Sequence, residues 1–254
     1  MLPHDRLAVA ELVLYGGTAL PAALWLWVRE GWRRLEWLFV FTLATLRIIG
    51  SILQLKQPDN GPPSSVTSIA ILNGIGLSPL LCIMLMLVHR LCKTADHQRL
   101  AKIAILLHAL ILGALPLLIV GVLKLFKAGD GKTIGRILAA IGLAIFLQVY
   151  LAQTLVAVYA YTTSSLLKKK PFSFLSIAVL AMAPLILLRL IYSALSFFVT
   201  SSKTFNPVTG SLTAQVIMSI VPENAVTLIA VAWGLLHTEQ TPKNQYSNAY
   251  ELSR

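Results

Sequence analysis

Two arginines and two glutamates lie inside long apolar stretches of this chain, where an ionised side chain is costly. Arg47 and Arg189 stay charged at any accessible pH. A guanidinium at the centre of a bilayer costs about 2.5–3.5 kcal/mol even on lenient insertion scales. Glu11 and Glu223 are the carboxylates in such stretches. Because intramembrane charges often mark the path of a substrate or an ion, these four residues are the first candidates for chemistry.

Helix geometry predicts how these charges pair. With a rise of 1.5 Å per residue, Arg189 and Glu223 fall at the same depth on consecutive helices, so we expect a direct ion pair between them. Arg47 and Glu11 differ in depth by about 6 Å, a gap that a long arginine side chain spans. The exchanged pairing, with Arg47 on Glu223, satisfies the same depths nearly as well and stays open. Pairs of this kind also serve simply to fix the register of a bundle.

Each of the four charges heads a polar stripe along its helix. Residues four apart share a helix face, and Arg47 is followed at this spacing by Ser51, as Arg189 is by Ser193. These stripes converge at one depth and predict a polar midplane cavity that opens towards the lumen or the outside. The candidate residues for a ligand-binding site or polar core are Glu11, Tyr15, Arg47, Ser51, Asn73, Gln148, Arg189, Tyr192, Ser193, Glu223 and Asn224.

The composition identifies the class of protein that must position these residues. Of the 254 residues, 57% are hydrophobic and 12% are charged, whereas a soluble domain carries about 25% charged residues. Too few polar side chains remain to cover a soluble globule, so the chain is predicted to be a polytopic membrane protein. The net charge of +11 lies in short segments between apolar runs, which is typical of topology signals. We therefore expect no nucleic-acid partner.

Seven apolar runs are long enough to cross a bilayer. A spanning helix needs about 20 mostly apolar residues, and the runs that meet this length cover residues 7–28, 37–55, 67–91, 101–124, 135–165, 173–199 and 214–237. We predict an all-α, polytopic membrane bundle of seven transmembrane helices over residues 1–238. Residues 239–254 are expected to form a short, disordered cytoplasmic tail.

The distribution of basic residues predicts the orientation of the bundle. The connecting segments on the side of the C-terminus hold twelve Lys and Arg residues, and those on the other side hold seven. Because short cytoplasmic segments carry the excess of positive charge, we predict a lumenal or extracellular N-terminus and a cytosolic C-terminus. The segment between the fourth and fifth runs, with four basic residues, runs against this assignment.

Prolines and a repeated string bear on the shape of the bundle. Proline usually kinks a spanning helix, and five prolines fall within apolar runs, at positions 21, 79, 116, 184 and 222. They indicate either broken helices around a cavity or irregular packing alone. The string at 46–51 is similar to that at 188–193 in its Arg and its Ser. This similarity is compatible with a parallel 3+1+3 pseudo-repeat.

Two longer strings resemble a known family. Residues 47–55 and 71–81, together with Pro222-Glu223 in the last run, are similar to signatures of an uncharacterised fungal family of seven-helix integral membrane proteins. The resemblance covers essentially the whole chain. The family carries a domain of unknown function, so the resemblance implies the fold, the membrane location and a fungal source. It implies no activity and no set of catalytic residues.

Three functions remain open from the sequence. The favoured one is a carrier or receptor-like binder of a small metabolite, such as a secondary metabolite, through the polar midplane cavity. The second is a membrane-embedded enzyme like the small terpene cyclases, in which Glu223 or Glu11 would act as proton donor if its partner arginine lies elsewhere. The third is a non-catalytic structural subunit. The expected partners are the lipid bilayer and a small-molecule ligand, without a cofactor or a metal.

Overall fold

The structure, a computed structural model, describes residues 3–30, 35–56, 71–72, 74–94, 98–125, 131–163, 170–198 and 211–237. The regular elements in these ranges are all helical, which confirms the predicted all-α class. In chain order they are α1 Pro3–Leu14, the π-helical turn η1 Tyr15–Ala19, α2 Leu20–Glu30, α3 Leu35–Leu55, α5 Leu77–Thr94, α6 Gln98–Leu125, α7 Gly131–Thr163, α8 Lys170–Phe198, α9 Leu212–Gln215, the π-helical turn η4 Val216–Ile220 and α10 Val221–His237.

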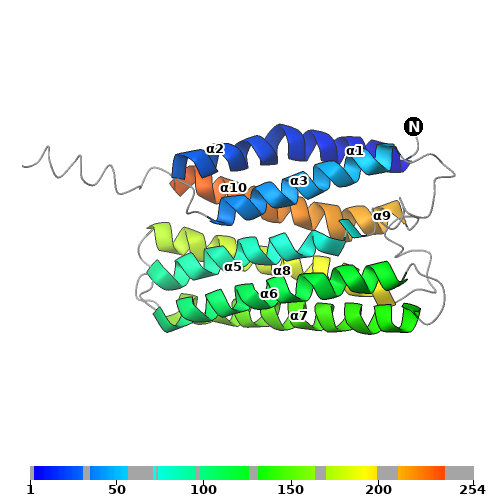
Figure 1. Cartoon of the computed structure of the whole chain (residues 1–254). Coiled ribbons are helices and arrows are strands. Elements are labelled where there is room, and N and C mark those ends of the chain that lie inside the picture. The colour runs from blue at the N-terminus through cyan, green and yellow to red at the C-terminus, as the bar shows by residue number, and fades with distance from the viewer. Residues whose placement is uncertain are drawn as a thin grey trace, which may run out of the picture.

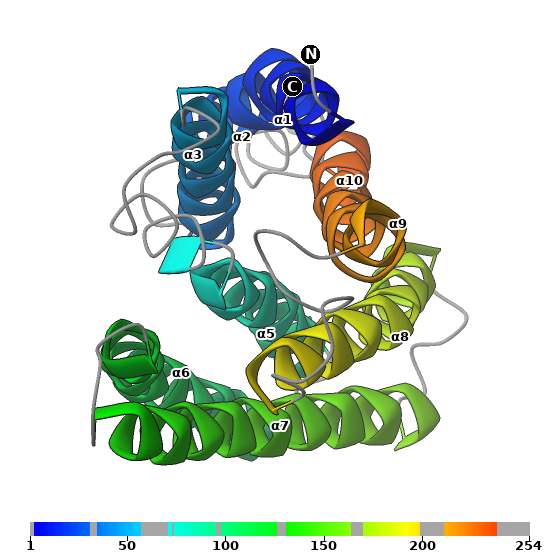
Figure 2. The same cartoon turned by 90° about the vertical axis from the view of Figure 1, so that its right-hand side faces the viewer.

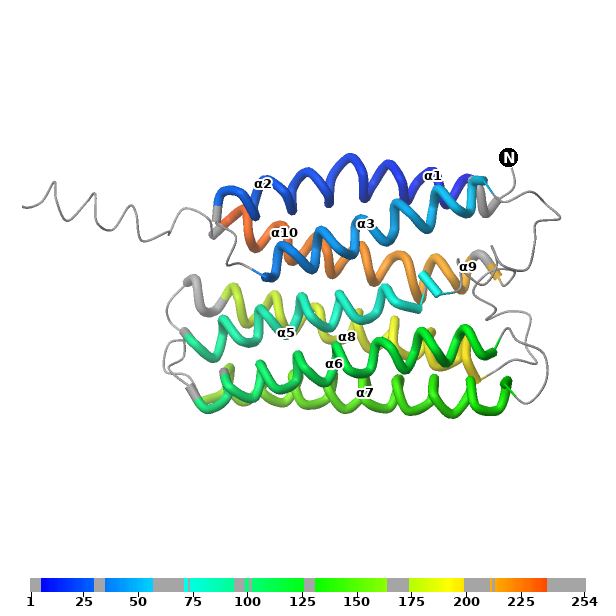
Figure 3. Tube along the Cα trace, viewed as in Figure 1, coloured from blue at the N-terminus to red at the C-terminus, as the bar shows by residue number. Residues whose placement is uncertain are grey.

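The helices form one antiparallel bundle. The first three elements are continuous in the chain and act as one helix, and so are the last three. Consecutive helices run in alternating directions (Figures 1 and 3). The start of α1 and the end of α10 therefore lie at opposite ends of the bundle, as seven crossings require (Figure 1). The predicted tail, residues 239–254, lies outside the described residues.

The described helices are long and apolar enough to make the chain a multi-pass membrane protein. Six spans meet the length and composition of a membrane crossing: Arg6–Arg29, Leu35–Leu55, Lys102–Leu125, Gly131–Thr163, Phe174–Phe198 and Thr213–Leu236. The remaining helix, α5, is the third crossing along the chain. It lies in the middle of the bundle with α3, α6, α7 and α8 around it (Figure 2). Large apolar side chains such as Leu106, Leu155 and Val28 point outwards from the surrounding helices. Outward apolar side chains of this kind suit a lipid solvent.

The third apolar run differs from its prediction. A helix is expected over residues 67–91, but the structure has a turn at Gly76, and α5 begins at Leu77. The reason is Pro79, which has no N–H to donate to the carbonyl of Ile75 four residues earlier. The Ser78 hydroxyl donates to that carbonyl instead, at 3.0 Å. The break is therefore satisfied locally, and residues 67–70 lie outside the described ranges.

Helices α6 and α7 pack backbone against backbone at two glycines. A Cβ added to Gly121 would lie 2.8 Å from the nitrogen of Ala139 and 3.0 Å from the carbonyl oxygen of Gly135. A Cβ added to Gly135 would lie 2.8 Å from the oxygen of Gly121. Small residues at helix contacts allow this close approach, which stabilises membrane helix pairs by van der Waals packing.

This close approach makes α6 sensitive to single methyl groups. We expect Gly121→Ala to lower the unfolding temperature of the detergent-solubilised protein, because the atoms that its Cβ would meet are backbone atoms that cannot rotate away. Gly113→Ala in the same helix is the matched control, since its Cβ would meet nothing within 4 Å and alanine gains about 1 kcal/mol of helix propensity over glycine. Equal unfolding temperatures for the two variants would contradict this account of the α6–α7 contact.

Candidate functional site

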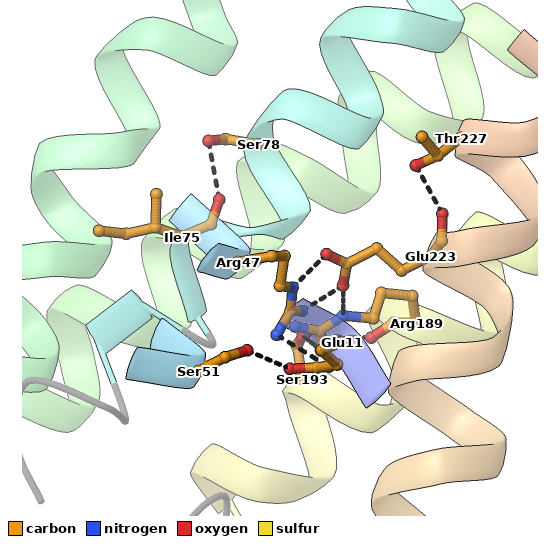
Figure 4. A network of polar contacts seen from close by, with 9 residues as sticks. All are labelled: Glu11, Arg47, Ser51, Ile75, Ser78, Arg189, Ser193, Glu223 and Thr227. Atoms are coloured by element: carbon orange, nitrogen blue, oxygen red, sulfur yellow. Dashed lines mark hydrogen bonds and ion pairs between the residues drawn. The ribbon is translucent and has the colours of Figure 1, made fainter. Parts of the chain in front are cut away.

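The four charged residues singled out in the sequence meet in one buried group, which we call the charge cluster: Glu11, Arg47, Arg189 and Glu223 (Figure 4). Arg47 donates from Nε and from Nη2 to the two carboxylate oxygens of Glu223. Arg189 Nε lies 3.4 Å from Oε2 of the same carboxylate. Arg47 Nη1 lies 4.0 Å from Oε1 of Glu11.

The charge cluster contains both predicted pairs and the exchanged pair. Arg189 contacts Glu223 and Arg47 contacts Glu11, as the depth argument predicts. The contact between Arg47 and Glu223 is the exchanged pairing that the sequence left as an alternative. It is the most extensive of the three because it uses two donors and both carboxylate oxygens. Glu223 is therefore shared by two guanidiniums.

The charge cluster is buried and formally neutral. Glu223 is 0%, Arg189 2%, Arg47 5% and Glu11 9% exposed. Two positive and two negative groups cancel, which is the condition for holding ions away from water, because an uncompensated buried charge costs several kcal/mol. Neither arginine points into the hydrocarbon. An anionic or strongly polar group that entered here would meet guanidinium donors, which recognise carboxylate and phosphate oxygens well.

Two π-helical turns position the carboxylates. In η1 the N–H of Leu20 donates to the carbonyl of Tyr15, five residues earlier. In η4 the N–H of Val221 donates to the carbonyl of Val216. Each of these donors is followed by a proline, so the widened turn ends where the regular helical bond cannot form. Single π-turns inside α-helices are frequent at functional sites, and these two lie beside the two carboxylates of the cluster in the sequence.

The turn at Gly76 brings the backbone against the charges. A Cβ added to Gly76 would lie 3.2 Å from Nη2 of Arg47 and 3.5 Å from Oε1 of Glu223. Only a residue without a side chain leaves the pair undisturbed at this distance. This role of Gly76 was not predicted from the sequence. The signal was its place just before Ser78-Pro79, where a helix tends to begin.

Polar side chains surround the cluster, as predicted. Ser51 donates to Oε2 of Glu11 at 3.2 Å. Arg189 donates from Nη1 to Ser193 at 3.0 Å, and its guanidinium carbon lies 5.7 Å from the ring centre of Tyr192. Among the described residues, two more predicted site residues carry buried polar atoms without a hydrogen-bond partner: the Tyr15 hydroxyl and Oδ1 of Asn224.

Of the remaining predicted site residues, one lies outside the described part of the chain and one points away from the cluster. Asn73 lies outside the described residues. Gln148 points outwards from α7, and Gln153 is the buried amide of that helix, with Nε2 3.4 Å from the sulfur of Met84. The choice of Gln148 was wrong because it lies off the stripe of buried residues, which are Gly135, Ala139, Gly142, Leu143, Phe146, Val149, Tyr150, Gln153, Ala157 and Ala160. Counting that three- and four-residue spacing would have found Gln153.

A second ion pair, between buried Glu36 and half-buried Arg90, lies at the start of α3. Arg90 Nε is 2.9 Å from Oε1 of Glu36, and its guanidinium carbon is 4.7 Å from the ring centre of Trp233. The pair links α3, α5 and α10. This pair was not predicted because Glu36 falls just before the second apolar run and Arg90, near the end of the third, was counted among the twelve basic residues that set the orientation. Extending the second run by one residue would have placed Glu36 on a helix, and Arg90 already lies inside the third run, 67–91.

Comparison with known proteins identifies a family. A family model described as a domain of unknown function (DUF7702) matches residues 1–240. No curated protein and no solved structure matches the chain. The match therefore supports the resemblance noted in the sequence and adds no activity.

The unequal contacts of the two carboxylates predict unequal losses of stability. Glu223→Gln leaves two buried guanidiniums without their shared counter-ion, and breaking a buried pair in this way costs about 3–5 kcal/mol. Glu11→Gln removes one contact of 4.0 Å and should cost clearly less. Unfolding temperatures of both variants in the same detergent check the order. A larger loss for Glu11→Gln would show that the shared contact is not the strongest in the cluster.

The backbone contact of Gly76 gives a separate prediction. Gly76→Ala should lower the unfolding temperature, because the methyl group would displace the Arg47 guanidinium from the Glu223 carboxylate. Gly74→Ala serves as the control, since its Cβ would meet only the ring of Phe197, at an ordinary 3.7 Å. If the two variants lose the same stability, the crowding at Gly76 is not what disturbs the protein.

Proposed function

We propose that this chain, which belongs to the DUF7702 family, is a carrier or receptor-like binder of a small molecule that it holds at the charge cluster. The observation that carries the proposal is the sharing of one buried carboxylate, Glu223, between the guanidiniums of Arg47 and Arg189. A ligand with an anionic or polar group would take up contacts with these donors. A metabolite that enters membranes would suit the lipid surroundings of the site.

Several features support binding over a purely structural role. One ion pair is enough to fix the register of two helices, whereas this cluster joins charges from α1, α3, α8 and α10. Two π-helical turns accompany it. Tyr15 and Asn224 keep buried polar atoms without a partner among the described residues, and buried groups of this kind are normally satisfied. Groups that a ligand would satisfy are expected in a binding site.

The orientation of the protein is part of the same proposal. The Lys and Arg excess favours a cytosolic C-terminus, so the end of the bundle where α1 and α9 begin would face the lumen or the outside. A ligand from that side would reach the cluster along the polar stripe that leads from Gln215 through Ser219 to Glu223, all of them buried. The Arg90–Glu36 pair would then lie nearer the cytosolic side.

The two other functions are less well supported. A cyclase-like enzyme needs a neutral carboxylic acid in an apolar pocket, whereas the carboxylate of Glu223 lies between two guanidiniums. A structural subunit would tolerate a neutral core. Because Glu223 pairs with both arginines, a test of the structural role must replace all four charges together, as Glu11→Gln, Arg47→Leu, Arg189→Met and Glu223→Leu.

Ligand-dependent stabilisation tests the proposal. We expect small organic anions from a screened panel to raise the unfolding temperature of the wild type in detergent, since a ligand that binds only the folded state stabilises it. Arg47→Leu should abolish this rise. Arg90→Leu is the matched control: it also removes an arginine that pairs with a buried glutamate of α3 but leaves the cluster intact, so it should lower the baseline unfolding temperature and keep the rise. A rise that persists in Arg47→Leu or in the fourfold neutral variant would refute the proposed site.

A further inference from the structure

We propose that the charge cluster takes amphipathic monoanions, and that Glu11 takes up one proton for each anion bound. This inference rests on the proposed function and specifies its ligand class and its coupling. The anionic group would displace Glu11 from Arg47, with Tyr15 as an additional donor.

The two carboxylates of the cluster are held unequally. Glu223 is wholly buried, receives two donors from Arg47 and lies 3.4 Å from Arg189. Glu11 lies 4.0 Å from Nη1 of Arg47 and accepts a hydrogen bond from Ser51. Because the ion pair of Glu11 is the looser one, an incoming anion exchanges with Glu11 more easily than with Glu223. The hydroxyl of Ser51 can accept as well as donate, so it also suits a protonated Glu11.

Tyr15 supplies a donor at the same place. It follows Glu11 by one turn, is 1% exposed, and its hydroxyl has no hydrogen-bond partner among the described residues. The hydroxyl lies within electrostatic range of all four charges of the cluster. A phenolic O–H bonds strongly to an anionic oxygen. An anion that took the place of Glu11 at Nη1 of Arg47 would also give this hydroxyl an acceptor.

The balance of charge requires a proton. The cluster is neutral with both carboxylates ionised, so a bound monoanion would leave one uncompensated negative charge in a low-dielectric interior, at a cost of several kcal/mol. The charged and titratable groups that face Glu11 are Arg47 from α3, Arg189 from α8, Glu223 from α10 and Tyr15 from its own helix. Guanidiniums are already protonated and Glu223 is held by two of them. Glu11 is left as the group that takes up the proton.

The surroundings of Tyr15 favour an apolar tail on the anion. Tyr15, Ala19 and Ala44 form a small apolar cluster of their own, separate from the main core, with Leu20 and Ile48 packed against it. This patch lies between the first helix and α3, beside the looser side of the charge cluster. A purely hydrophilic anion would gain nothing from it, whereas an alkyl chain would gain roughly 0.8 kcal/mol per buried methylene group.

The inference is tested with 1-decanesulfonate as probe and 1-decanol as its neutral counterpart. A sulfonate stays anionic throughout, so any pH dependence belongs to the protein. Calorimetric titration of the protein in phosphatidylcholine nanodiscs, with empty discs as blank, gives the affinity. Repeating it in two buffers of different ionisation enthalpy gives the number of protons taken up. We expect about one proton per sulfonate, an affinity that falls by up to about tenfold per pH unit as pH rises, and no matching binding of decanol.

Two variants make the test specific. Glu11→Gln should bind the sulfonate without proton uptake, with an affinity independent of pH and higher than that of the wild type at alkaline pH. Tyr15→Phe should weaken binding several-fold with an unchanged unfolding temperature, because its hydroxyl bonds nothing among the described residues. The titration is repeated with phosphatidylglycerol included in the nanodiscs. If this lipid competes with the sulfonate for the site, the natural anion is a membrane lipid, and if it does not compete, the natural anion is a soluble amphiphile.

Other results would overturn the inference in distinguishable ways. Proton uptake that persists in Glu11→Gln would refute the coupling to Glu11, and equal binding of decanol would refute the ligand class. In either case, Arg47-dependent binding of another anion would still uphold the proposed function. No binding of the sulfonate to the wild type would refute the ligand class. Loss of the Arg47 dependence for every anion tested would refute the proposed function itself.

Discussion

The bundle depends on one carboxylate that neutralises two guanidiniums in a lipid solvent. Glu223 lies where α3, α8 and α10 approach each other, so each of these helices can adopt only the depth and rotation that bring its charge to that point. The apolar packing around α5 sets no such fine constraint, because leucine side chains slide past one another at little cost and lipid tails are as apolar as they are. The ion pairs therefore select one arrangement of the helices among many that apolar packing alone would allow.

The two carboxylates of the charge cluster contact Arg47 in different ways. The contact of Glu223 with Arg47 is bidentate and buried, which favours a permanent pair. The contact of Glu11 with the same arginine is longer and is shared with a serine hydroxyl. A fixed half and an exchangeable half can thus coexist on one guanidinium. This asymmetry is what makes binding a more economical explanation than register alone.

Much of the fold, and less of the site, could be predicted from the sequence. Run length and composition are sufficient for the seven helices, because a bilayer fixes both. Depth along each helix brought Arg47, Arg189 and Glu223 together but could not choose their pairing, since depth says nothing about rotation about the helix axis. That same limit explains the choice of Gln148 over the buried Gln153. Pro79 marks the turn at Gly76 locally, but the contact of Gly76 with Arg47 and Glu223 joins segments distant in sequence, which no local pattern contains.

The widened turn in the last helix has a consequence for how its polar residues line up. Gln215, Ser219, Glu223 and Thr227 recur every four residues and are all buried. In a regular α-helix, with 3.6 residues per turn, each such step would rotate the stripe by about 40° and carry its far end towards lipid. The five-residue hydrogen bond of Val216–Ile220 absorbs part of that drift. The four polar side chains thereby stay on the buried side of the last helix, and removing one residue from the π-helical turn would rotate Gln215 away from the other three.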